Sequence, residues 1–208
     1  RINPDYQGIG PGLAKSYEFH NESRTIILRL HEGIKWSDGV PFTADELLFW
    51  HEDVVRNEEL TPVQPVNWSP GGKLMKMKKV DDYTVQMDFS VPYPIVINLL
   101  AHYPGSQFMF APKHYMKQYH PNYVDIKKLD QMARATGLER WYQLFNEKGK
   151  ICSTIPCALG LPTLSPFVIK STGAQSYLYE RNPYYWRVDP AGNQLPYIDQ
   201  VRIFILQD

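Results

Sequence analysis

The sequence predicts a mixed α+β fold that contains much antiparallel sheet. Strand-like runs joined by short polar turns fill the first part of the chain and return near its end. The stretch between them has the spacing of amphipathic helices, and no repeat or low-complexity linker interrupts the chain. Strands followed by helices and then by strands, without regular alternation, favour an α+β arrangement over a parallel α/β sheet.

Two hairpins are expected before residue 90. AKSYEFH and RTIILRL flank a polar turn at 21–23, and Ile26, Leu28 and Leu30 recur at every second position. KLMKMKKV and YTVQMDF flank the turn at 81–82 with the same alternation, and the lysines keep the first of these strands partly solvated. Each hairpin therefore has one face for a core.

The stretch IKWSDGVPFTADELLFW, residues 34–50, joins the two hairpins and crowds several polar groups together. Thr43 is placed to cap the helix that follows, and Glu46, three residues later, completes a capping box. Asp38, Asp45 and Glu46 lack the spacing of a calcium loop, and the helix dipole already accounts for carboxylates in a first turn. We therefore predict that this corner is scaffold, with no catalytic or cation site.

The middle of the chain reads as helical, and strands return after it. Short helices over IVINLLAH and KHYMKQY follow prolines, and a longer amphipathic stretch covers 124–150, with Gly137 as a break or a packing point. PFVIKS and QSYLYERN are strand-like, and a long loop through NPYYW and Pro196 leads to the last strand-like run, VRIFIL.

The charge balance argues against nucleic acid as a partner. Lys plus Arg is 22 and Asp plus Glu is 22, so the formal net charge is +0 and no broad positive field would gather phosphates. The longest apolar run, 95–101, is far below the ~20 residues needed to cross a bilayer. We expect no membrane span in this chain.

No pattern of catalytic or metal-ligating residues is present in the sequence. The six histidines are scattered without an HExxH spacing, and no serine lies in a G-x-S-x-G elbow. Cys152 and Cys157 are separated by four residues, and a small disulfide loop and two free thiols both fit this spacing. The expectation is a protein that is not an enzyme and has no resident metal or cofactor.

Four motifs carry a family resemblance. LRLHEGIKWSDGVPFTADELLFW, VDDYTVQMDFSVPYP, APKHYM and YLYERNPYYW…LPYIDQVRIFI stand in the order seen in the family 5 extracellular solute-binding proteins of ATP-driven (ABC) importers. The chain resembles this family over nearly its whole length. The resemblance implies part of a type II periplasmic-binding-protein-like fold, in a receptor that delivers a small solute to a membrane permease.

The same resemblance implies a division of the chain and a location. Residues 1–110 correspond to a small subdomain that carries the WSDGVPFTADEL signature, 111–208 correspond to part of the first lobe, and the second lobe is absent. The protein is expected in the periplasm or outside the cell, with a lipid anchor as one option. Peptide is the first choice of solute and oligosaccharide a close second. A non-transport interaction or sensor module on the same scaffold is the other alternative.

Three residues are candidates for contact with the solute. Aromatic faces suit both sugar rings and peptide side chains. Trp68 lies in the loop PVNWSPGG, which has no helical or strand period that would explain its burial, so it is the first candidate. Trp50 and His51, on the helix that follows Thr43, are weaker candidates because a core position and a structural hydrogen bond would also account for them.

Overall fold

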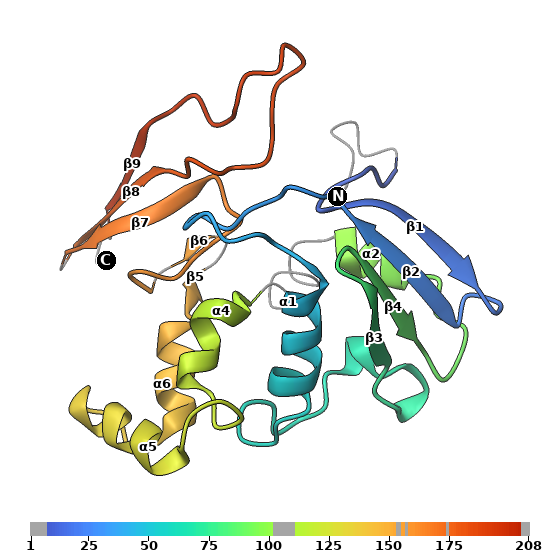
Figure 1. Cartoon of the computed structure of the whole chain (residues 1–208), viewed down its shortest axis with the longest axis horizontal. Helices are drawn as coiled ribbons and strands as arrows, with labels where there is room; N and C mark the ends of the chain where they lie inside the picture. The colour runs from blue at the N-terminus through green and yellow to red at the C-terminus, as the bar shows by residue number, and fades with distance from the viewer. Residues whose placement is uncertain (1–7, 102–110, 153–154, 157, 174, 205–208) are drawn as a thin grey trace. The chain divides into compact units, whose positions relative to one another are not determined.

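The computed structural model describes residues 8–101, 111–152, 155–156, 158–173 and 175–204 (Figure 1). The chain divides into two compact units. Unit 1 consists of Arg1–Glu32 and Thr43–Lys113, and unit 2 consists of Gly33–Phe42 and His114–Asp208. Both units combine antiparallel strands with helices, which confirms the predicted α+β class.

Unit 1 is built on a four-stranded antiparallel sheet in the order β1-β2-β4-β3 (Figure 1). Its strands are β1 (Ala14–His20), β2 (Thr25–Leu30), β3 (Lys76–Asp81) and β4 (Thr84–Asp88). They form the two hairpins expected from the alternating pattern, and β2 pairs with β4 to join them.

The register of this sheet places the apolar positions on one face. Ile26 lies opposite Met87, and Leu28 lies opposite Val85. These four side chains are buried, as the period of two predicts, because successive side chains of a strand point to opposite faces. The other face is polar: Thr25 Oγ1 donates a hydrogen bond of 2.7 Å to Asp88 Oδ1.

The helix after Thr43 has two parts. Helix α1 (Ala44–Phe49) continues directly into a π-helical segment, Trp50–Val55, so together they reach the length that the sequence predicts. Leu47 and Phe49 are buried, and α1 packs against β3 and β4. Unit 1 also contains α2 (Val96–Ala101) and two 3₁₀ turns, Val66–Trp68 and Pro70–Gly72.

The helices of unit 2 follow the predicted order. They are α4 (Lys113–Met116), whose first residue belongs to unit 1 and which continues as a 3₁₀ turn at Lys117–Tyr119, then α5 (Ile126–Ala135) and α6 (Trp141–Lys148). Gly137 ends α5 with φ +82°, a left-handed conformation that glycine adopts without strain, and this confirms the predicted break.

Contacts between α5 and α6 form the helical core of unit 2. Leu129 and Ala133 of α5 and Trp141, Leu144 and Phe145 of α6 are buried. A hydrogen bond also joins the two helices: the Trp141 backbone N–H, at the start of α6, donates to Asp130 Oδ1 of α5 at 2.9 Å.

The strands of unit 2 form a separate three-stranded antiparallel sheet in the order β7-β8-β9. Its members are β7 (Phe167–Thr172), β8 (Ser176–Arg181) and β9 (Gln200–Phe204), and a short pair, β5 (Ile151–Cys152) and β6 (Ile155–Pro156), precedes them. Cys157 lies outside the described residues, so the pairing of Cys152 with Cys157 stays an open prediction.

The signature stretch is shared between the units. Its turn, within Gly33–Phe42, belongs to unit 2, whereas Thr43 and the helix belong to unit 1. This differs from a division at residue 110, and whether the two units correspond to the subdomain and the first lobe stays a prediction. Within the ranges that the structure describes, no helix is both long and apolar enough to cross a bilayer.

Candidate functional site

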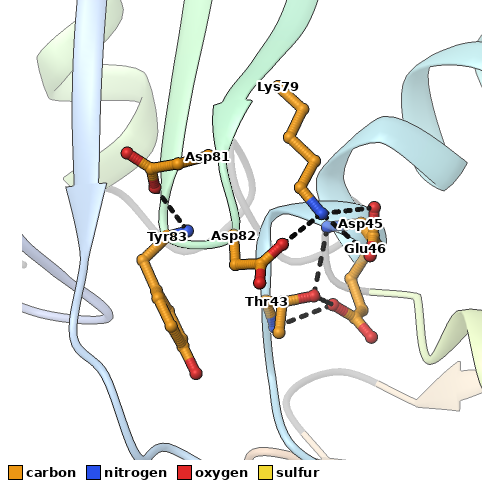
Figure 2. A network of polar contacts seen from close by, with 7 residues as sticks. All are labelled: Thr43, Asp45, Glu46, Lys79, Asp81, Asp82 and Tyr83. Carbon is orange, nitrogen blue, oxygen red and sulfur yellow. Dashed lines mark hydrogen bonds and ion pairs between the residues drawn. The ribbon is translucent and has the colours of Figure 1, made fainter.

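The corner at the start of α1 is a capping box, as predicted (Figure 2). The Asp45 backbone N–H donates to Thr43 Oγ1 at 3.3 Å, and the Thr43 backbone N–H donates to Glu46 Oε2 at 2.9 Å. The Thr43 hydroxyl also donates to Glu46 Oε2, at 3.1 Å. Thr43 therefore satisfies a backbone N–H of the first helical turn, and Glu46 satisfies the backbone N–H of the N-cap, which are the roles that the sequence assigns to them.

Lys79 of β3 ties this helix start to the β3–β4 turn. Figure 2 shows its ammonium between two carboxylates, with Asp82 Oδ1 at 2.6 Å and Asp45 Oδ1 at 3.2 Å. These contacts, with the hydrogen bond to Asp82 foremost, raise the pKa of Lys79. The Ala44 backbone N–H donates to the Asp82 carbonyl at 2.8 Å, so the turn and the helix are also joined through the backbone.

The remaining carboxylate of the turn is also occupied. Asp81 Oδ1 accepts from the Tyr83 backbone N–H at 2.8 Å, and this bond is the main reason that the pKa of Asp81 is lowered. Among the described residues, no group of three or more His, Cys, Asp or Glu side chains is arranged to hold a metal ion. Asp45, Glu46, Asp81 and Asp82 each have a hydrogen-bond donor or a cation within the protein as a partner.

We expect Thr43→Ala to lower the free energy of unfolding by about 1 kcal/mol, because Ala cannot accept the Asp45 N–H bond. Urea denaturation followed by circular dichroism measures this, and Thr43→Ser, which keeps the hydroxyl, is the matched control. Solute affinity of the full-length protein should not change once folding is accounted for. A hundredfold loss of affinity at unchanged stability would show that the corner is a binding site.

The structure brings the three predicted contact residues together inside unit 1. Trp50 and Trp68 meet edge to face, with ring centroids 5.5 Å apart and an interplanar angle of 75°. His51 Nε2 lies 2.9 Å from the Met75 carbonyl oxygen, and the Met75 backbone N–H donates to the Trp68 carbonyl at 2.8 Å. Met75 thus links the helix that carries His51 to the turn that carries Trp68.

All three side chains are buried, with exposed fractions of 4% for Trp50, 3% for His51 and 6% for Trp68. His51 Nδ1 is also occupied, by Glu52 Oε1 at 2.7 Å. Packing and hydrogen bonding within unit 1 therefore explain the cluster without a ligand, and contact with solute stays a prediction. The role of Met75 could not be recognised from the residue pattern, because its backbone carbonyl and N–H make these contacts.

The long loop of unit 2 between β8 and β9 is held by its own polar groups. Asp189 accepts from the Asn193 backbone N–H at 2.8 Å and from Asn193 Nδ2 at 2.9 Å, and it also accepts from the Tyr197 hydroxyl. Gln194 Nε2 donates to the carbonyls of Pro183 and Tyr185, both at 2.9 Å. The loop therefore has a defined conformation even though few of its side chains are buried.

The hydrogen bond from Tyr197, followed by those from Asn193, lowers the pKa of Asp189 from its ordinary 3.8 to about 2. A lowered carboxyl pKa means that these bonds stabilise the folded loop above pH 3.8 and are lost as pH falls through about 2. We expect the Asn193 amide signals in NMR spectra to titrate at that lower pH. Tyr197→Phe should move the midpoint upward, and a midpoint at 3.8 in the unsubstituted protein would contradict the contact.

A comparison with models of protein families shows which family the chain belongs to. Residues 8–208 match the model described as bacterial extracellular solute-binding proteins, family 5 middle. The chain belongs to this family. This is a family of solute-binding receptors, and the resemblance seen in the four motifs is confirmed.

Among curated relatives, the chain is 32% identical over 192 residues to the periplasmic alpha-galactoside-binding protein of Rhizobium meliloti, covering 92% of this chain and 25% of the relative. It is 22% identical over 202 residues to the periplasmic oligopeptide-binding protein OppA of Escherichia coli, covering 90% of this chain and 31% of the relative. The chain therefore spans only about a quarter to a third of the length of these relatives.

Solved structures of family members share the fold. An oligopeptide-binding protein OppA matches with 41% identity and a TM-score of 0.83, over 95% of this chain and 30% of that one. The MelB binding protein of Agrobacterium fabrum, solved with stachyose, matches with 30% identity and a TM-score of 0.72, over 94% of this chain and 26% of that one. The expected type II periplasmic-binding-protein fold, present here in part, is confirmed.

Proposed function

We propose that this chain is part of an extracellular receptor that binds a small solute and delivers it to the membrane permease of an ABC importer. The observation that carries the proposal is the family match across residues 8–208. The protein would act outside the cytoplasmic membrane, free or lipid-anchored, as a receptor and not as an enzyme. A non-transport sensor on the same scaffold is the competing class.

Peptide is the proposed solute. Its support is the 41% identity and close superposition with a structure named oligopeptide-binding protein OppA. An oligosaccharide is the second candidate, supported by the 32% identity to an alpha-galactoside-binding protein and the 30% identity to a protein solved with stachyose. Each candidate solute is supported by a relative with clear sequence identity as well as a shared fold. An experiment must therefore decide between peptide and oligosaccharide.

Trp68, with Trp50 and His51 behind it in the cluster, is the proposed point of solute contact. The support comes from the loop that precedes it: Val63 is 77% exposed and Val66 is 83% exposed, and no charged residue occurs in 60–68. Two exposed valines in an uncharged segment that leads into a buried indole can cover an apolar part of a ligand.

A thermal-shift screen of the full-length protein tests the solute. A ligand at 100 times its dissociation constant stabilises the folded state by roughly 2.7 kcal/mol, which is a measurable rise in Tm. We expect a shift with a tripeptide pool and none with stachyose or raffinose. A shift with the sugars alone would replace peptide by oligosaccharide, and no shift with either class would favour the sensor alternative.

A further inference from the structure

The solvent side of α5 carries three positive charges and no acid. Leu129 and Ala133 are buried, so the opposite side of this helix faces away from the core of unit 2 (Figure 1). Lys127, Lys128 and Arg134 lie on that side, and all three are exposed. We call these three residues the cationic face.

The acids of the same helix are engaged elsewhere. Asp125, the N-cap, accepts from the backbone N–H groups of Lys127 and Lys128 at 3.0 and 3.2 Å. Asp130 accepts from the Trp141 backbone N–H, and its other oxygen lies 3.9 Å from Arg140. Neither carboxylate forms an ion pair with the cationic face in the part of the chain that the structure describes.

Several other cations among the described residues form ion pairs, which the three residues of the cationic face do not. Ion pairs within the described residues include Lys15–Glu32, Arg24–Glu22, Arg29–Glu18, Arg56–Glu52, Lys79–Asp82, Lys150–Glu147 and Lys170–Glu180. The chain as a whole is neutral, but residues 114–150 contain seven Lys or Arg against four Asp or Glu. This stretch therefore carries a net positive charge in a chain that is neutral as a whole.

We propose that the cationic face docks the protein on an anionic phospholipid surface. Lysine and arginine near such a surface are attracted to it without close packing, and the attraction adds up over neighbouring cations. Lys127 and Arg134 are seven residues apart, roughly 10 Å along the helix axis, so their charges are spread along a line that an extended charged plane can meet.

A membrane suits this face better than an acidic protein does. The other residues on the solvent side are Gln131 and Ala135, so the face has none of the aromatic or large apolar anchors that supply most of the affinity of protein interfaces. An anionic bilayer surface attracts cations without such anchors.

Docking of this kind does not depend on the proposed solute function. It would hold a solute receptor near the bilayer in which its permease lies, but the contact uses none of the residues proposed to meet solute. Vesicle binding and solute binding can therefore fail separately, and each experiment tests its own proposal.

The test is co-sedimentation of the full-length protein, produced without lipid modification, with vesicles of phosphatidylcholine alone or with about one-third phosphatidylglycerol. The variant K127E/K128E/R134E removes the cationic face. The matched control, K73E/K76E/K78E, makes the same change in net charge at exposed lysines of unit 1. Circular dichroism confirms that both variants are folded.

We expect binding to the anionic vesicles only, weakening as salt rises because exposed charges are screened. The α5 variant should lose about tenfold or more of its vesicle partitioning, and the control should lose much less. Equal losses in both variants, or no binding of the unsubstituted protein to anionic vesicles, would overturn the proposal. Binding to polyglutamate without binding to vesicles would replace the membrane by an acidic protein.

Discussion

Replacing Trp68 by alanine is expected to lower the free energy of unfolding by about 3–5 kcal/mol, the range for truncating a buried aromatic side chain. The indole is 6% exposed and meets the Trp50 ring edge to face, so its removal leaves a cavity in unit 1. Urea denaturation followed by far-ultraviolet circular dichroism measures the change without relying on tryptophan fluorescence.

Val66→Ala is the matched control for Trp68→Ala. Val66 is two residues earlier in the same turn but 83% exposed, so its truncation should change the free energy of unfolding by less than about 0.5 kcal/mol. Trp68→Phe keeps an aromatic ring in the cluster and leaves enough stability for solute binding to be measured. Lost solute affinity in Trp68→Phe with little loss of stability supports the proposed contact, whereas full affinity removes Trp68 from the site.

The 208-residue chain by itself is expected to bind solute at least about a hundredfold more weakly than the full-length protein, because binding sites enclose most of a ligand's surface. The chain spans only 25% and 31% of two curated relatives, so most of such an enclosure would come from elsewhere in the polypeptide. Isothermal titration calorimetry on both proteins, with the solute found in the thermal-shift screen, gives the two dissociation constants.

Circular dichroism and a cooperative thermal transition must first show that the 208-residue chain is folded. With that control in place, equal affinities would mean that this chain holds the whole site. The enclosure argument would then be wrong, and the Trp50–Trp68 cluster would become the first place to look for the ligand.

Several features of this protein were determined by the sequence alone, and each depends on residues close together in the chain. The alternation of Ile26 and Leu28 placed them on the buried face of β2, because a strand turns every second side chain to the same side. Thr43 and Glu46 formed the predicted capping box, and Gly137 ended α5. Such signals have fixed spacings, so they can be recognised without knowledge of the fold.

Other features were decided only by the tertiary structure. Trp68 packs against Trp50, which lies on the helix that follows Thr43. The turn that carries Trp68 is held by the backbone N–H of Met75, whose carbonyl contacts His51. The loop around Trp68 has no regular period, so nothing local distinguishes a buried indole from one that lines a cleft.

The signature turn gives the clearest case of a feature that local patterns cannot reveal. Ser37 exchanges hydrogen bonds with Thr163: its backbone N–H donates to the Thr163 carbonyl, and its hydroxyl accepts from the Thr163 backbone N–H, both at 3.0 Å. His114 Nε2 lies 2.8 Å from Asp38 Oδ2. These contacts join positions up to 126 residues apart and place Gly33–Phe42 in unit 2. Local spacing determines the turn and the helix cap, but only the folded chain determines which unit each of them joins.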